Sequence, residues 1–132
     1  MDGFSSSKFL EAIPPAVHGT GSFTVGTTID ARGYLYAHFT VHTGAVAGAG
    51  TVPVQIESSA TSGGSYADVT GAVVTAAAAG VQTIAVRLDG ASGFIRVKAA
   101  TTGGTSIALG VMVMLTNGIN SANYASTPTV TV

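Results

Sequence analysis

Two of the three histidines, His38 and His42, stand four residues apart in a segment of alternating polar and apolar residues, and metal ligation is the first chemistry they suggest. Imidazole nitrogens are common zinc ligands, and each ligand atom must lie about 2 Å from the metal. Four residues along a β-strand span about 13 Å, however. The two side chains therefore share a strand face without reaching a common ion, and we expect no metal site.

The other groups able to do chemistry form no recognisable constellation. The carboxylates lack the spacing of a calcium loop, and no pair is placed by sequence for glycoside hydrolysis. No serine lies in Gly-x-Ser-x-Gly, and the glycines of residues 48–50 complete neither a dinucleotide-binding nor a P-loop motif. We therefore predict no catalytic residue, no cofactor and a protein that is not an enzyme. The scattered carboxylates are Asp2, Glu11, Asp30, Glu57, Asp68 and Asp89.

The composition is short of charge, because only 8% of the 132 residues are charged. Average soluble domains carry about 25%, and surface charge keeps copies of a protein apart in solution. This shortage predicts a building block whose surface is covered by neighbours in an assembly. The formal net charge of -1 offers no basic surplus for phosphates, so we expect no direct nucleic-acid partner. The absence of cysteine excludes disulfides and thiol nucleophiles.

No segment predicts insertion into a membrane. The longest run of apolar residues and glycine, residues 107–115, is about half the length that a bilayer requires. The first residues also lack the charged and apolar regions of a signal peptide. We expect no membrane partner and synthesis in the cytoplasm of a host cell.

Alternation with period two, which is typical of β-strands, begins near residue 22. Tyr34–Thr43 is the clearest strand. The segments Gln82–Leu88 and Phe94–Ala99 alternate on either side of a glycine-containing turn and predict a β-hairpin. Ser106–Thr116 predicts a longer strand that is apolar on both faces.

Pro53 interrupts one further alternating segment, residues 51–58, and places that strand at a sheet edge or at a bulge, because proline cannot donate a ladder hydrogen bond. Short strands at intervals of about a dozen residues, separated by glycines, are typical of β-sandwiches. The sequence therefore predicts an all-β fold over residues 22–116. We expect a single antiparallel sandwich of about eight strands, jelly-roll or immunoglobulin-like, with almost no helix.

The two ends of the chain differ from this middle part. Residues 1–21 predict an extended N-terminal arm, in which Pro14-Pro15 excludes helix and central strand. We expect the arm to add a strand to a neighbour's sheet, with the two prolines marking where pairing stops. Residues 117–132 predict an extended C-terminal tail whose last residues could add one strand. The arm's candidate contacts with capsid or oligomer are Phe4, Phe9, Leu10 and Ile13.

Aromatic and sulfur-containing side chains supply a second set of candidate contacts. Alternation places Tyr34 and Tyr36 beside His38 on one strand face, where they could anchor a protein interface or stack on sugars. We favour the protein interface, since the chain contains no tryptophan. Met112 and Met114 lie either beneath a second layer of the same domain or in an apolar patch that requires a partner.

One segment resembles a known family. A strand ending in Glu57-Ser58 is followed by a Gly/Ser turn at residues 59–65 and then by Tyr66-Ala67-Asp68-Val69. This order is similar to small β-sandwich head proteins of tailed bacteriophages. Gly93–Lys98 and the apolar strand after it fit the same pattern, so that the resemblance covers roughly residues 30–116. Such proteins act as cement or decoration on the outside of the capsid, and the resemblance implies that role here.

These observations lead to one functional hypothesis and one alternative. The hypothesis is a structural virion protein, a capsid cement on the outer surface of the virion that binds across neighbouring major capsid protein subunits. We expect it to be a homo-oligomer and favour a trimer over a dimer, because capsid lattices offer local symmetry axes. The alternative is a carbohydrate- or receptor-binding module of a phage fibre or tail that uses Tyr34, Tyr36 and His38.

Overall fold

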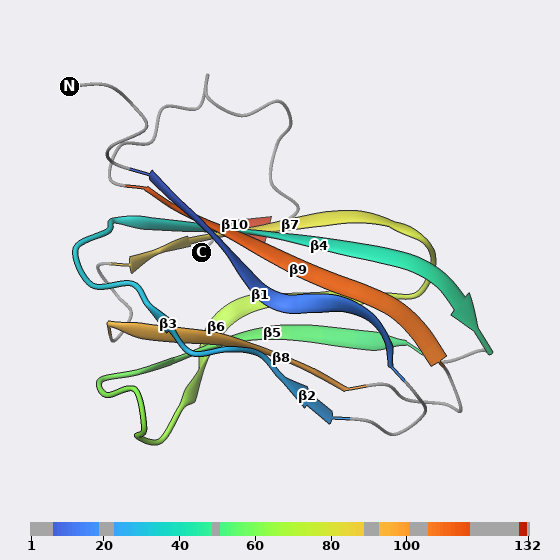
Figure 1. Ribbon diagram of the computed structural model, residues 1–132, viewed down its shortest axis with the longest axis horizontal. Helices are drawn as coiled ribbons and strands as arrows, with labels where there is room; N and C mark the ends of the chain where they lie inside the picture. Colours follow the sequence, from blue (N-terminus) through green and yellow to red (C-terminus); the bar gives the residue numbers. More distant parts are fainter. Residues whose placement is uncertain are drawn as a thin grey trace.

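The computed structural model describes residues 7–18, 23–48, 51–88, 93–100, 106–116 and 130–131. In these residues the regular elements are β-strands, which form two sheets packed face to face (Figure 1). The predicted all-β sandwich is confirmed. In chain order the strands are β1 (Ser7–His18), β2 (Phe23–Val25), β3 (Ile29–Asp30), β4 (Tyr36–Ala47), β5 (Val52–Ser59), β6 (Ala67–Ala76), β7 (Gly80–Arg87), β8 (Phe94–Ala100), β9 (Ser106–Thr116) and β10 (Val130–Thr131).

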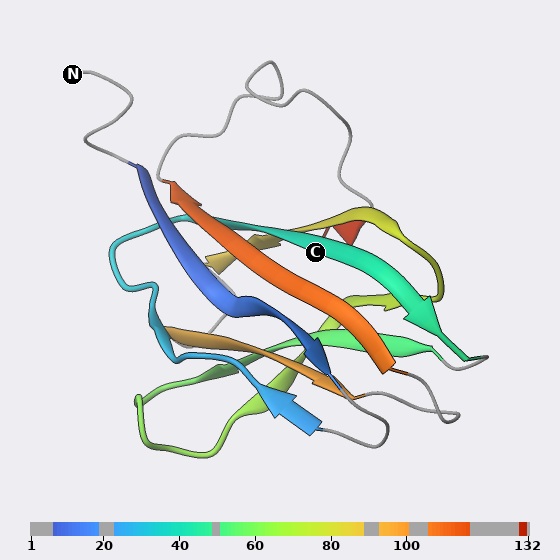
Figure 2. The ribbon, with the colours of Figure 1, turned by 45° about the vertical axis from the view of Figure 1, so that its right-hand side comes forward.

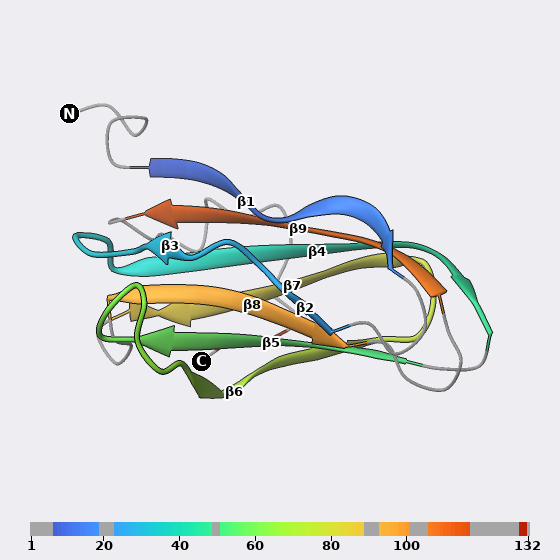
Figure 3. The ribbon, with the colours of Figure 1, turned by 60° about the horizontal axis from the view of Figure 1, so that its bottom comes forward.

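Within the described residues, each of the two sheets contains five strands. Sheet A has the order β1-β9-β4-β7-β10, and Figure 3 shows β1, β9 and β4 side by side in it. Sheet B has the order β2-β8-β5-β6, and β3 also pairs with β8. The described pairs are antiparallel except for the short parallel pairing of β10 with β7. This one parallel pair is an exception to the predicted antiparallel pattern.

The core lies between the sheets and is built from small and medium apolar side chains. Phe39 is the only aromatic residue that is fully buried in the described part of the chain. Around it, alternate residues of the central strands point inward and are almost completely buried, as their period of two requires. These residues are Val41, Val111 and Val113 in sheet A, and Val54, Ile56, Ile95 and Val97 in sheet B.

Strand β1 corrects the prediction that residues 1–21 form an arm outside the domain. Ser7–His18 pairs along its length with β9 of the same chain and forms one edge of sheet A (Figure 2). Pairing also continues past Pro14-Pro15 as far as His18, so the prolines do not mark its end. Edge strands tolerate proline, because their outer side has no ladder partner. The remaining residues of the predicted arm lie outside the described residues.

Two register shifts in β1, at Glu11/Ile13 and at Ile13/Ala16, explain why its sequence lacks strand alternation. A bulge lets two consecutive side chains face the same way. Ala12 and Ile13 are accordingly both buried in the core, with exposed fractions of 0% and 1%. Pro15 then packs closely on β9, where only Gly110 leaves room for its ring.

The predicted hairpin of Gln82–Leu88 with Phe94–Ala99 is wrong, although both segments are strands. β7 lies in sheet A beside β4 and β10, whereas β8 lies in sheet B beside β5. Alternation shows that a strand has one buried face. It does not show which of the two sheets the strand belongs to, because strands of both sheets have one buried face.

Two other predictions concern β5 and the C-terminal tail. β5 lies inside sheet B rather than at its edge, but its registered pairs with β8 begin at Val54, one residue after Pro53. The proline therefore interrupts no pair on that side. In the tail, Val130–Thr131 adds the short strand β10 to sheet A, and the other residues of 117–132 lie outside the described residues.

The burial of β1 leads to the first prediction, because Ile13 fills the core while Val17 of the same strand is exposed. Ile13→Ala should lower the free energy of unfolding by about 2–5 kcal/mol, from lost apolar burial and the cavity left behind. Val17→Ala should change it by less than about 0.5 kcal/mol. Urea denaturation measures both values. Equal effects of the two substitutions would show that β1 is not docked on the core.

Candidate assembly interface

The outward side chains of four neighbouring strands of sheet A form a surface with very little charge, which we call the A face. Cross-strand register places these residues in rows, for example Phe9, Met114, His38 and Ala85. Glu11 on β1 and Arg87 at the end of β7 are the charged residues of the A face within the described part of the chain. Its members are Phe9, Glu11, Pro15 and Val17 on β1; Ala108, Gly110, Met112 and Met114 on β9; Tyr36, His38, Thr40 and His42 on β4; and Val81, Thr83, Ala85 and Arg87 on β7.

Several large apolar side chains on the A face lie open to solvent. The exposed fractions are 74% for Val17, 67% for Phe9, 59% for Val81 and 40% for Met112. A sandwich whose outer faces meet only water normally alternates apolar inward with polar outward residues. Exposed apolar groups that gather on one face mark a protein contact more often than isolated ones do. The A face is therefore the candidate functional site.

A shallow apolar hollow of about 220 Å³ lies in the A face, where β1, β9 and β4 meet. Two glycines keep its floor low: a side chain at Gly44 would come within 2.9 Å of Ala108, and one at Gly110 within 3.1 Å of Pro15. Polar groups are few around it, with His42 at its rim. Its shape and lining suit an apolar side chain from another protein. The lining residues are Pro15, Ala16, His42, Gly44, Ala108, Leu109, Gly110 and Met112.

His38 and His42 lie on the A face, as their spacing predicted, opposite Met114 and Gly110 of β9. Partial burial of His38 lowers the pKa of its imidazole, because desolvation disfavours the charged form. His38 thus adds little charge to the face at neutral pH. Among the described residues, no three histidine, aspartate or glutamate side chains are grouped to hold a metal ion.

The structure divides the six predicted contact residues among different environments. Phe9 lies exposed on the A face, whereas Leu10 packs partly against the core and Ile13 is completely buried. Ile13 is thus unavailable to a partner, which corrects its predicted role. Phe4 lies outside the described residues.

The two tyrosines, predicted to share one face, are separated. Tyr34 precedes β4, donates its backbone N–H to the carbonyl of Ala31 and packs against the core. Tyr36, the first residue of β4, lies with its ring under the guanidinium of Arg87, 5.9 Å from ring centroid to Cζ. A platform made of both rings is therefore not formed.

Sequence reasoning missed three members of the A face: Pro15, Val17 and Val81. The first two were assigned to the end of a separate arm, and Val81 lies just before the predicted strand Gln82–Leu88 and was assigned to no element. The available signal was an apolar residue at an outward position of an otherwise alternating strand. That signal becomes readable only when the inward positions of β1 and β7 are known.

The outer face of sheet B carries charge that is neutralised within the chain. Glu57, which is 5% exposed, accepts a hydrogen bond from Arg96 Nε at 3.1 Å and lies 3.5 Å from Lys98 Nζ. Lys98 also contacts Asp68 at 2.6 Å, and this hydrogen bond raises the pKa of its ammonium group. Arg96 stacks over the ring of Tyr66 at 3.9 Å. Two cations and two carboxylates thus leave no net charge in this network.

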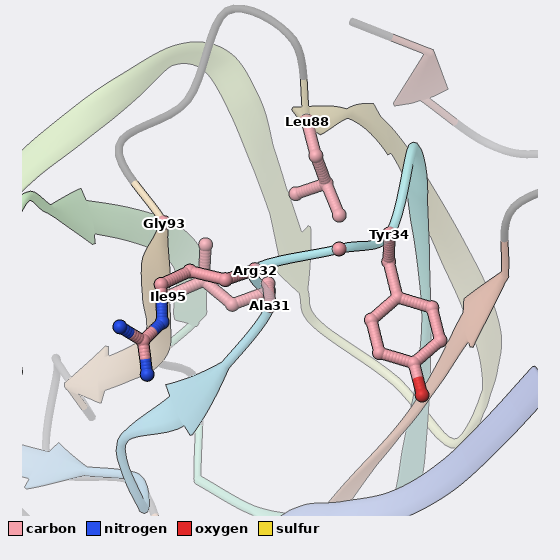
Figure 4. A pocket seen from close by; sticks show the side chains of 7 residues that line it. Ala31, Arg32, Tyr34, Leu88, Gly93 and Ile95 are labelled. Atoms are coloured by element: carbon pink, nitrogen blue, oxygen red, sulfur yellow. The ribbon is translucent and has the colours of Figure 1, made fainter.

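A small cavity of about 120 Å³ lies at one end of the sandwich, and Figure 4 shows Leu88 and Tyr34 among its lining residues. Ligand pockets commonly measure about 300–1,000 Å³, so this cavity is too small for most ligands. Its one charged group, Arg32, forms an ion pair with Asp30 at 2.7 Å and lies over the ring of Phe94. Hydrogen bonds from Arg32 lower the pKa of Asp30 to about 2. We interpret the cavity as a packing gap between the ends of the sheets.

Comparisons with known proteins identify the fold and no family. No protein-family model and no curated sequence matches the chain. The crystal structure of the PBSX exported protein XepA is similar, with a TM-score of 0.66 and 12% identity over 97% of this chain and 43% of XepA. A protein of Bacillus endospore appendages, described as disulfide-linked pili, gives a TM-score of 0.53 and 13% identity over 84% of this chain and 89% of its own. At these identities the likeness shows a shared sandwich fold.

The described residues also contain no helix that is long and apolar enough to cross a membrane.

The buried carboxylate of Glu57 generates a prediction about stability. Glu57→Gln should lower the free energy of unfolding by about 1–3 kcal/mol, because Arg96 and Lys98 then remain partly buried without their shared carboxylate. Asp68→Asn, at a side chain that is 54% exposed, should cost less than about 1 kcal/mol. Urea denaturation at pH 7 tests the order. A Glu57→Gln protein as stable as the unchanged chain would contradict the role given to this network.

The exposed pair of Asp30 and Arg32 generates a prediction about pH. Asp30 should titrate near 2 in the native protein, below its ordinary 3.8, and Arg32→Ala should return it towards that value. Because the folded-state pKa is lowered, the pair contributes stability above about pH 3.8 and loses it as the pH falls through about 2. Carboxyl carbon shifts in an NMR titration report the value directly. An Asp30 pKa unchanged by Arg32→Ala would exclude the pair as its cause.

Proposed function

We propose that this protein is a structural subunit of a noncovalent protein assembly, and more specifically a cement protein on the outer surface of a phage capsid. The observation that carries the proposal is the A face, a four-strand surface with exposed apolar side chains and only two charged residues, Glu11 and Arg87, among those described. Such a surface is poorly suited to water and well suited to a protein neighbour.

Further support comes from chemistry that the chain lacks and from the proteins it resembles. With no cysteine, its subunits cannot be joined by disulfides, unlike the appendage protein of similar fold. Any assembly then depends on apolar and polar contacts. The resemblance of residues 30–116 to phage head proteins supports the capsid as the proposed location. XepA, also of similar fold, is described as an exported protein.

The mechanism of a cement protein follows from differential binding. A capsid is strained at the joints between its subunits when it is filled with DNA. A protein that binds across a joint in the mature geometry, and less well in the precursor geometry, shifts the equilibrium towards the mature state. The partner in this proposal is the major capsid protein, and no catalytic step is involved.

The alternative function, a carbohydrate- or receptor-binding module, depended on a platform of Tyr34, Tyr36 and His38. Tyr34 packs against the core, and Tyr36 lies under Arg87, so two rings are not presented together. The geometry therefore favours the structural role.

The proposal is tested on particles of the phage that encodes the chain. We expect the protein in gradient-purified mature particles at a fixed number of copies per capsid, measured by quantitative mass spectrometry. Particles that lack it should release DNA at a lower temperature, and adding the purified protein back should restore the original temperature. Finding the chain only in the soluble lysate, with particle stability unchanged by its loss, would refute the proposal.

A further inference from the structure

The exposed apolar side chains of the A face call for a partner surface that covers them, and the distribution of charge on the face indicates which kind of partner fits. Met112 and the apolar hollow lie on its middle and β1 side, Val81 lies on its β7 side, and the charged residues Glu11 and Arg87 lie on β1 and at the end of β7. A strongly charged partner would lose hydration over the apolar part of this surface without gaining opposite charges there. The occupant that fits is a surface equally poor in charge. We infer that the occupant is the A face of a second copy of this chain, which gives a two-fold symmetric dimer.

The size of the A face agrees with this inference. Four strands at a spacing of about 4.8 Å give a width of roughly 19 Å. The eight steps from Ala108 to Thr116 on β9 give a length of about 27 Å. The projected area is roughly 500 Å², and protruding side chains raise the accessible area towards the roughly 800 Å² per partner of a standard stable interface.

The relief of the A face also permits a self-complementary contact. Phe9 and Val17 stand out from the β1 edge, while the hollow over Gly110 lies between their rows and is open to solvent. In an isologous contact, a knob of one copy meets a hollow of the other, and the reverse contact forms at the same time. The face thus offers both halves of a two-fold contact.

Electrostatics disfavour sheet B as the dimer contact. Burying its outer face would desolvate Arg96, Lys98, Glu57 and Asp68, which already satisfy one another within the chain. Burying the A face desolvates Glu11 and Arg87, which lie on its two outer strands, and two histidines, of which His38 is already partly buried. The cost of polar desolvation is therefore lower for the A face.

This inference rests on the proposed assembly role, and it identifies a second copy of the chain as the first partner in that assembly. A face that pairs with itself gives a dimer, whereas the lattice argument from the sequence favoured a trimer. A two-fold dimer would present two equivalent sheet B surfaces to the capsid, and it suits a local two-fold position at a joint between subunits.

The test is sedimentation equilibrium of the purified full chain from 1 to 100 µM at pH 8. We expect a dimer with a dissociation constant in the micromolar range. Val81→Lys and Met112→Lys each place an ammonium group in the contact and should weaken dimerisation at least tenfold, because a buried unpaired charge is costly. The matched control is Val73→Lys on sheet B, an exposed valine at 38%, which should change the constant less than threefold.

Thermal unfolding monitors folding, since all three substituted side chains are exposed and should leave the unfolding temperature nearly unchanged. A chain that is monomeric at 100 µM, a trimer, or a dimer weakened by Val73→Lys alone would each overturn the inference. These outcomes are separate from the particle experiment. A monomer that is nevertheless found in mature particles would remove the dimer and leave the cement role standing.

Discussion

Two sheets share one core only if each central strand keeps an apolar face towards the other sheet, and this requirement governs the rest of the molecule. The core is made almost entirely of valine, isoleucine, leucine and alanine, with Phe39 as its one fully buried aromatic residue among those described. Small side chains bury little area each, so many strands must contribute. Because many strands must contribute apolar side chains, even β1, an irregular strand containing two prolines, forms part of sheet A and of the core.

The outer faces of the two sheets differ in polarity. Sheet B places four charged side chains on its surface and pairs them, with Glu57 between Arg96 and Lys98. Sheet A leaves methionine, valine and phenylalanine exposed and carries only Glu11 and Arg87 as charged residues on the part of its outer face that is described. A group of the chain's few charged residues therefore lies together on the outer face of sheet B. The outer face of sheet B is therefore suited to contact with water, whereas the outer face of sheet A is better suited to contact with another protein.

The edge position of β1 connects folding with assembly. Its inward residues, Ala12 and Ile13, complete the core, while Phe9 and Val17 of the same strand widen the A face. The bulges that bury Ala12 and Ile13 together also bring Pro15 onto Gly110, at the floor of the hollow. One strand thus contributes to the stability of the domain and to the shape of the surface proposed for association. An isolated arm with the same sequence would have supplied neither.

The sequence by itself determined the all-β class, the approximate positions of most long strands and the placement of His38 and His42 on one face. Local alternation and turn chemistry suffice for these, because they reflect the burial of a strand's two faces. Only the tertiary structure decided which sheet each strand joins, so β7 and β8 could be read as a hairpin although they lie in different sheets. It also decided the docking of Ser7–His18, because register shifts hide the alternation of a bulged edge strand. The A face could likewise be identified only from the tertiary structure, since an exposed valine is recognised as part of a surface only when the neighbouring strands are known.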